Sequence, residues 1–307
     1  MTATTAPSRL RGTTRRRRNE GVVRAILFAA AALSVLISAG IVLSLIFEAL
    51  TFITSVDLSQ LFSDGWFPRR GMFSLPTVIA GTLIITIVAM IIAAPIGLFS
   101  AIYLAEYASP RVRSIVKPTL EILAGIPSVV LGFFALTWIS PNVVHSLFSN
   151  AKGFSLLAAG IGVGILTIPL VASISEDAMR AVPLALREAS YGLGARRLTT
   201  SMRVVVPAAI SGIVAAMLLA ISRAIGETMV VAIAAGASGG SLFTLDPLGP
   251  GQTLTGAMAS LATGSDNVTG NSAAFLSLYF LGFILFVMTL ALNVVGDVFV
   301  RRTRQKY

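Results

Sequence analysis

The chain has 307 residues, of which 55% are hydrophobic and 12% are charged, and its formal net charge is +10. Soluble globular domains carry about 25% charged residues, so this composition indicates an integral membrane protein. The absence of cysteine excludes disulfides, a thiol nucleophile and a cysteine-ligated metal, and the single histidine excludes a multi-histidine metal site. We therefore expect no metal or other cofactor.

Six apolar stretches reach the length of about 20 residues that a helix needs to cross a bilayer. In chain order they cover about 25–47, 76–104, 119–140, 155–175, 208–235 and 273–299. The first is too long for the apolar core of a signal peptide, so we interpret it as a retained helix. The sequence therefore predicts an all-α integral membrane protein with six transmembrane helices.

Positive charge is distributed unevenly between the connections. Arginine and lysine crowd the segment before the first span, the connections after the second and fourth spans, and the tail after the sixth. The opposite connections hold only Arg69, Arg70 and Lys152. By the positive-inside rule, both termini are expected in the cytoplasm. The basic run at 15–18 is interpreted as topogenic and not as a nucleic-acid site, because no aromatic residues are interleaved with it.

Two charged side chains interrupt the fifth span, in AISRAIGETMVVAIAAG at 220–236. A charge at mid-membrane costs about 2.5–3.5 kcal/mol on insertion scales, so such residues usually face a bundle interior or a water-filled path. Arg223 and Glu227 are four residues apart, which predicts that they share one helix face. The guanidinium of Arg223 suits a bidentate contact to an oxyanion, with Glu227 holding it when no anion is bound. The alternative is a structural ion pair.

Two weaker features lie elsewhere. Pro127 falls inside the third span and is expected to kink it. Glu176, Asp177 and Arg180 stand where the fourth span meets the cytoplasm. A solvated charged face is the simpler interpretation of these three residues, and a gating network is the alternative.

The connection between the fourth and fifth spans, about 176–207, is longer than a simple link needs. Within it, PLALREASYGLG begins with a proline suited to a first helical turn and ends in glycines that can terminate a helix. A basic stretch and RVVVP follow. The sequence predicts two short helices around a glycine-bearing turn at the cytoplasmic surface. A helix lying on lipid is the alternative.

The stretch EASYGLGARRLTTSMRVVVP resembles the EAA loop of ABC-importer permeases, with Glu-Ala-Ala, three residues, Gly, nine residues, then Ile-x-Leu-Pro. Four residues match at the right spacings: Glu188, Ala189, Gly194 and Pro207. Three depart conservatively: Ser190, Val204 and Val206. The resemblance implies the type I ABC-importer permease fold, with this loop, 183–207, docking on a separate ATPase subunit. It assigns coupling to Glu188, Ala189, Ser190, Gly194, Ala195 and Pro207.

No ATPase motif occurs in the chain itself. A Walker A loop requires G-x4-G-K-[ST], and none of the three lysines, Lys117, Lys152 and Lys306, follows a glycine. No span shows a carboxylate pair or a nucleophile elbow. We therefore expect a transport subunit and not an enzyme, with ATP hydrolysed by a partner.

Two further stretches resemble the phosphate-specific permeases: AIYLAEYASPRVRSIVKPTLEILAGIPSVVLGFFAL at 101–136 and RAIGETMVV at 223–231. Gly-Glu-Thr-Met after the arginine is more similar to the PstC type than to the PstA type. The resemblance covers roughly 75–300 and associates Arg223 and Glu227 with transport. Ser128, in AGIPS, is a weaker candidate for the path.

The resemblance implies a subunit of a bacterial phosphate importer that works by alternating access in the cytoplasmic membrane. Its implied partners are a PstA-type permease, a dimer of ATP-binding subunits and an extracytoplasmic phosphate-binding protein. The expected segments are a cytoplasmic tail at 1–24, a first helix at 25–47, the permease domain at 75–300 and a tail at 301–307. The alternatives are another oxyanion (sulfate, molybdate or phosphonate) and an ATP-independent anion carrier.

Overall fold

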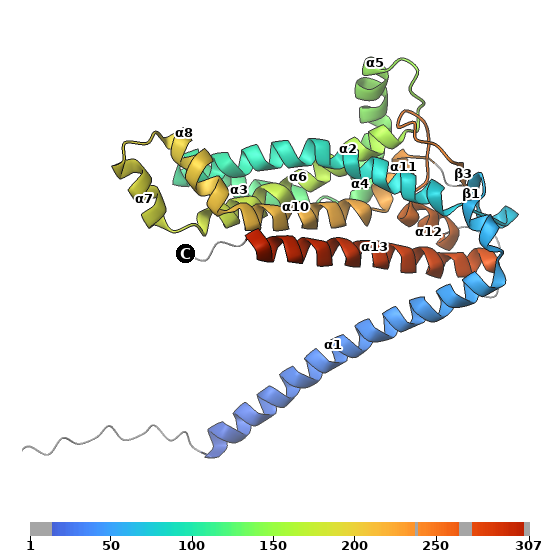
Figure 1. Ribbon diagram of the computed structural model, residues 1–307, viewed down its shortest axis with the longest axis horizontal. Helices are drawn as coiled ribbons and strands as arrows, with labels where there is room; N and C mark the ends of the chain where they lie inside the picture. Colours follow the sequence, from blue (N-terminus) through green and yellow to red (C-terminus); the bar gives the residue numbers. More distant parts are fainter. Residues whose placement is uncertain (1–13, 237–238, 264–271, 304–307) are drawn as a thin grey trace, which may run out of the picture. The chain divides into compact units, whose positions relative to one another are not determined.

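A computed structural model describes residues 14–236, 239–263 and 272–303, so parts of both predicted tails lie outside it (Figure 1). The chain divides into two units, Met1–Phe47 and Glu48–Tyr307. The described helices are α1 (Thr14–Ser55), α2 (Leu75–Ile102), α3 (Pro110–Ala124), α4 (Ser128–Phe134), α5 (His145–Leu147), α6 (Leu156–Arg180), α7 (Leu184–Gly192), α8 (Arg197–Thr200), α9 (Val206–Ala208), α10 (Ile210–Ile225), α11 (Met229–Ala234), α12 (Leu254–Ala262) and α13 (Ala273–Thr303). Two 3₁₀ helices are η1 (Leu58–Phe62) and η2 (Pro68–Arg70), and three π-helical segments are η3 (Tyr103–Tyr107), η4 (Ala135–Val144) and η5 (Ser201–Val205).

Five described helices are long and apolar enough to cross a membrane, and a sixth span forms if one bent pair counts as one span. The five cover Glu20–Ser55, Leu75–Tyr107, Ser128–Leu147, Leu156–Arg180 and Ala273–Arg302. The bent pair joins Arg197–Ala208 to Ile210–Ile225 at an angle of 69°. The predicted all-α membrane fold is confirmed, but the fifth span is not a straight helix.

The third span begins and ends later in the chain than the predicted 119–140. Residues 110–124 form the separate helix α3, in which no residue is buried, and the span itself runs from Ser128 to Leu147. Pro127 precedes α4 and does not kink a continuous helix. The reason is local, because proline disfavours helical geometry in the residue before it, here Ile126.

The centre of the second unit is the packing of α2 along α6. Gly97 faces Val171 and Gly160 faces Val88, so closely that an added Cβ would lie 2.7 Å and 2.6 Å from those side chains. Small residues at such positions let membrane helices approach closely. Helix α10 packs against this pair, α13 packs against α10, and Figure 1 shows all four running alongside one another.

The end of the unit opposite α7 and α8 is closed by folded connections. Strands β1 (Gly65–Phe67), β2 (Met72–Phe73) and β3 (Ser241–Leu242) form an antiparallel sheet in the order β2-β1-β3. Phe52 packs on Phe73 and Phe280, with ring centroids 5.0 Å apart in each pair, and Trp66 is fully buried beside them. This aromatic cluster holds the start of α2 and the start of α13 together at this end.

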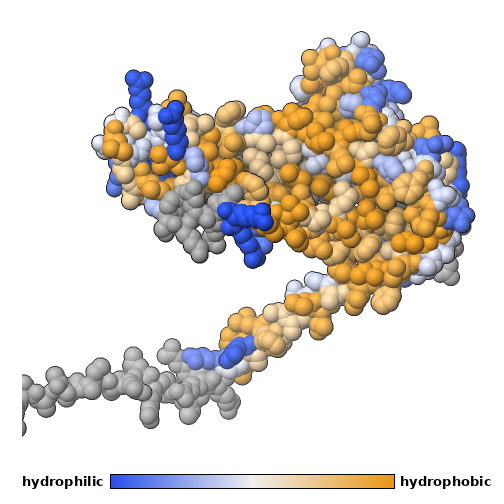
Figure 2. Space-filling view, viewed as in Figure 1, coloured by the Kyte–Doolittle hydropathy of each residue, from blue (hydrophilic) through white to orange (hydrophobic). Residues whose placement is uncertain are grey.

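The surface of the second unit is that of a membrane protein. Figure 2 shows apolar residues over the middle of its visible face and hydrophilic residues towards its two ends. Many large apolar side chains on its spanning helices are exposed, among them Ile91, Phe99 and Val295 at 67–68%. An exposed apolar band suits lipid contact.

Candidate functional site

The charged stretch of the fifth span lies at a break between two helices. Helix α10 ends at Ile225, residues 226–228 are not helical, and α11 begins at Met229. The prediction that Arg223 and Glu227 share one helix face was therefore wrong. The physical reason is that the helix ends two residues after Arg223 and the chain turns, with Glu227 N donating to Ala224 O at 3.3 Å.

Neither charge has an ion-pair partner within the described residues. The Arg223 side chain is exposed, and Glu227 is half-buried. A Glu227 carboxylate oxygen accepts a long hydrogen bond from Val230 N at 3.5 Å, and its backbone carbonyl accepts from Thr255 Oγ1 at 2.7 Å. Glu227 therefore links the start of α11 to α12, while Arg223 is exposed and has no ion pair among the described residues.

Helix α12 completes this region. Its first residue, Leu254, donates its N–H to Thr82 Oγ1 of α2 at 3.1 Å, and Thr253 caps the helix by accepting from Gly256 N at 3.0 Å. Three segments far apart in sequence, from α2, the 226–228 break and α12, are therefore joined by hydrogen bonds. Sequence reasoning missed α12, because it is too short and too rich in small residues for a transmembrane helix.

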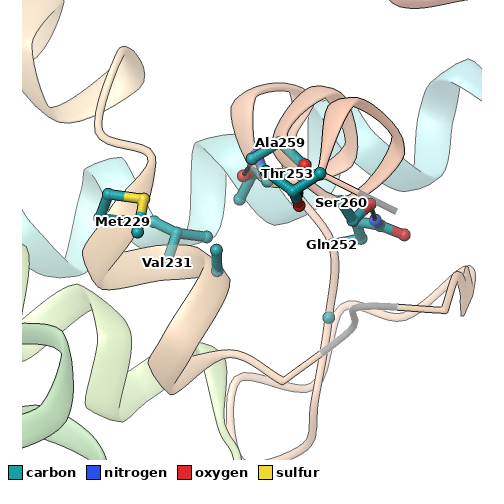
Figure 3. Close-up of a pocket in the computed structure, with 10 residues that line it drawn as sticks. Met229, Val231, Gln252, Thr253, Ala259 and Ser260 are labelled. Carbon is teal, nitrogen blue, oxygen red and sulfur yellow. Dashed lines mark hydrogen bonds between the residues drawn. The ribbon is translucent and has the colours of Figure 1, made fainter. Parts of the chain in front are cut away.

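Two cavities flank α11 and α12. The smaller, about 160 Å³, lies between Met229 and Val231 on one side and Gln252 and Ser260 on the other (Figure 3). Gln252 is 4% exposed; its amide nitrogen donates to Ser260 Oγ at 3.2 Å, while its buried carbonyl oxygen has no partner among the described residues. Buried polar atoms normally find partners, so this cavity suits a polar ligand or water.

The larger cavity, about 470 Å³, opens beside the helix break. It is lined by Gly226 and Thr228 of the break, by Thr255 at the start of α12, and by apolar residues of α12 and α13. Ser128, the weaker candidate, is the first residue of α4 and half-buried. No hydrogen bond joins Ser128 to Arg223 or Glu227 within the described chain.

The predicted loop of two short helices around a glycine-bearing turn is present. Helix α7 carries Glu188 and Ala189, both exposed, and the turn follows with Gly194 at φ +77° and then Ala195. Ser190 Oγ lies 2.9 Å from Thr200 Oγ1 and so joins α7 to α8. Pro207 lies beyond η5 in the short helix α9, just before the 69° bend.

An ion pair that sequence reasoning did not predict anchors this loop. Arg187 of α7 donates to Glu106 Oε1 at 2.9 Å and to the carbonyls of Met179 at 2.9 Å and Val182 at 2.6 Å. Glu106, in η3 directly after α2, is 6% exposed, and its other oxygen lies 3.5 Å from Ser201 Oγ. Two features of the sequence could have indicated this pair: the single carboxylate of Glu106 at the end of an apolar span, and the single cation, Arg187, in PLALREASYGLG.

The charges at the end of α6 form a buried cluster. Glu176 is 0% exposed and pairs with Arg113 at 2.6 Å and Lys117 at 2.8 Å, both on α3. The interpretation of Glu176 as part of a solvated face was therefore wrong, because α3 covers it. Burial by itself lowers the pKa of Lys117, but hydrogen bonds to Asp177 and Glu176 outweigh it, and the net shift is upward.

The comparisons with known proteins agree on a permease. Residues 93–306 match the family described as "Binding-protein-dependent transport system inner membrane component". The probable ABC transporter permease protein YqgH of Bacillus subtilis is 36% identical over 67% of this chain and 68% of its own length. The phosphate transport system permease protein PstC of Mesorhizobium japonicum is 32% identical over 88% of this chain and 86% of its own.

The fold is found in a solved transporter as well. A chain of a bacterial alginate ABC transporter, crystallised with an alginate-bound periplasmic protein, superposes with a TM-score of 0.65 at 14% identity, covering 95% of this chain and 98% of the other. At that identity the likeness concerns the fold alone. The membrane-spanning helices and the matched residues together make this chain a multi-pass transport permease of the binding-protein-dependent inner membrane component family.

Proposed function

We propose that this chain is the PstC-type permease subunit of an ATP-driven importer of inorganic phosphate. The similarity to the Mesorhizobium PstC protein extends over most of both chains and supports this cargo. The structural observation that carries the proposal is Arg223, an exposed guanidinium with no ion pair among the described residues, in a mostly apolar segment whose other charged residue is Glu227. An unpaired charge within a span is costly unless it serves a polar path.

The proposed path runs past the helix break. Arg223 supplies the positive charge that lowers the barrier for a divalent anion, in a bidentate contact to its oxygens. Thr228 and Thr255 line the adjacent cavity and would make this part of the path polar. In this proposal Glu227 positions the start of α11, and Ser128 contributes a hydroxyl from α4. Alternating access would then open the path to one side of the membrane at a time.

The proposed docking surface for the ATPase is the loop from α7 to α9. Glu188, Ala189 and Gly194 are exposed, and Leu193 is 89% exposed, so apolar surface is available to a partner. The Arg187–Glu106 ion pair would pass movement of this loop to η3, which continues α2. The other proposed partners are a PstA-type permease and an extracytoplasmic phosphate-binding protein.

The proposed orientation places both termini in the cytoplasm of a bacterium. On this view the chain comprises a cytoplasmic tail at 1–24, a first membrane helix at 25–47, the permease domain at 75–300 and a second tail at 301–307. Support comes from the basic residues of the loop between α6 and α10 and of the end of α13.

The test is uptake of radiolabelled phosphate in cells that lack this chain, restored by the wild type, by Arg223→Gln or by the matched control Arg302→Gln. Arg302 is exposed at the end of α13 and far in sequence from the break. We expect the wild type and the control to restore uptake and Arg223→Gln to abolish it at equal membrane levels. Normal uptake by Arg223→Gln would refute the assignment of this site.

Competing anions and energy supply separate the alternatives. Excess sulfate, molybdate or phosphonate should leave phosphate uptake intact, and strong competition by one of them would make that anion the cargo. An ATP-independent carrier would keep working after ATP depletion and would tolerate Glu188→Ala. Loss of uptake after ATP depletion, and loss of uptake in Glu188→Ala, would both support the ATP-driven importer.

A further inference from the structure

A basic cavity lies at the end of the second unit that carries α7 and α8. Its volume is about 520 Å³, and residues of η3, α3, α6, α7 and α8 line it. Its charged lining consists of four arginines and one carboxylate: Arg113, Arg180, Arg187, Arg197 and Glu106. Arg187 already has a role in the docking loop proposed above, but neither that loop nor the transport path gives a role to the guanidinium groups of Arg180 and Arg197.

The negative groups around the cavity are already neutralised. Arg187 pairs with Glu106 and also occupies the carbonyls of Met179 and Val182 at the end of α6. It therefore neutralises the carboxylate and satisfies two carbonyls at the negative end of that helix. Arg113 pairs with the buried Glu176.

Two guanidinium groups remain for a ligand. Arg180 is 46% exposed at its side chain, and the Glu176 carboxylate oxygen beside it is 3.9 Å away and already held by Arg113 at 2.6 Å. Arg197 lies over the ring of Tyr107 at 5.1 Å and forms no ion pair within the described residues. The stacking orients the guanidinium but leaves its N–H donors free.

A helix end adds to this positive field. Pro110, the first residue of the 15-residue helix α3, lines the cavity. Ser109 caps that helix by accepting from Val112 N at 3.3 Å, and its carbonyl accepts from Arg113 N at 3.0 Å, so Arg111 N is the first-turn donor left for an anion. Guanidinium forks and a helix N-terminus are two groups that proteins often use to hold phosphate.

We propose that this cavity binds a phosphate-type oxyanion at the cytoplasmic face, held between Arg180 of α6 and Arg197 of α8. The ligand is either the headgroup of an anionic phospholipid or inorganic phosphate. Since the two arginines lie on either side of α7 in the sequence, the bound anion fixes α7 and α8 against the end of α6. Binding itself does not depend on the phosphate cargo proposed above, whereas its cytoplasmic placement rests on the proposed orientation.

The test measures binding to the full-length chain purified without added phospholipid, together with any partner subunits that remain bound. The probes are radiolabelled inorganic phosphate, short-chain phosphatidylglycerol, and phosphatidylcholine of the same chain length. All proteins carry Arg223→Gln, so that anion bound on the transport path does not contribute. The variants are Arg180→Gln with Arg197→Gln, the same pair changed to lysine, and the control Arg196→Gln, an exposed neighbour that does not line the cavity.

We expect the glutamine pair to weaken binding at least tenfold, the lysine pair to weaken it less, and the control to bind normally. Preference for phosphatidylglycerol over phosphatidylcholine identifies a lipid headgroup, and saturable binding of inorganic phosphate alone identifies the free anion. No binding by any probe, or equal losses in Arg196→Gln and in the glutamine pair, would overturn the proposal. The lysine pair keeps both positive charges. If a variant elutes normally in gel filtration and still binds more weakly, misfolding is excluded as the cause of its weaker binding.

Discussion

Removing the carboxylate of Glu176 tests the packing of α3 on α6. The side chain is fully buried, and its oxygens lie 2.6 Å from Arg113 and 2.8 Å from Lys117, whose side chains are 26% and 22% exposed. In Glu176→Gln, Arg113 loses its carboxylate partner and Lys117 keeps only the exposed Asp177, so both cations must recover water. Breaking a buried pair costs about 3–5 kcal/mol, and because both cations keep some solvent we expect about 3 kcal/mol.

The measurement is the free energy of unfolding in mixed micelles with rising SDS. The matched control is Asp177→Asn, which removes a neighbouring carboxylate that also contacts Lys117 but is 61% exposed. An exposed pair contributes about 1 kcal/mol or less, so this variant should remain close to the wild type. In a Lys117→Met background, Glu176→Gln should cost at least about 1 kcal/mol less, because one of the two cations that contact Glu176 is gone. Coupling of about 0.5–3 kcal/mol is usual for residues in contact.

The pH dependence gives a second check. A lysine whose folded pKa is raised contributes stability below its unfolded pKa of 10.5, and that contribution is lost as the pH rises through the folded value. The cost of Glu176→Gln should therefore stay constant between about pH 6 and pH 9. Equal destabilisation by Glu176→Gln and Asp177→Asn would show that the carboxylate of Glu176 is not the group that joins α3 to α6.

Two further substitutions probe backbone positions. Gly194 has φ +77°, and no atom lies within 4 Å of the place that a Cβ would take. Gly194→Ala should therefore destabilise the α7–α8 turn by about 1 kcal/mol through backbone strain alone, and it should lower uptake more than Gly192→Ala does. Equal uptake by the two variants would contradict a role for the turn. At Gly81, an added Cβ would lie 2.2 Å from the carbonyl oxygen of Gln252. Gly81→Ala should therefore push the start of α12 away from α2 and reduce the amount of folded protein seen in gel filtration. Gly40→Ala, where no atom lies within 4 Å of the added Cβ, should not reduce it.

Much of this protein follows from local sequence. The lengths of the apolar stretches give the membrane class, and α2, α6 and α13 lie where the pattern predicts them, because about 20 consecutive apolar residues are stable only when buried in lipid or protein. The loop of α7 and α8 is also local, since a proline start, helix formers and a left-handed glycine specify it without distant contacts.

Other features were decided by contacts between distant segments. The break between Arg223 and Glu227 is invisible to hydropathy, and it is held by Thr255 from α12, 28 residues further along the chain. Glu106 meets Arg187 across 81 residues, and Glu176 meets Lys117 across 59. A sequence shows that a charge lies near the end of a span, but only the packing of α3, α6 and α7 decides whether that charge faces water or a buried partner.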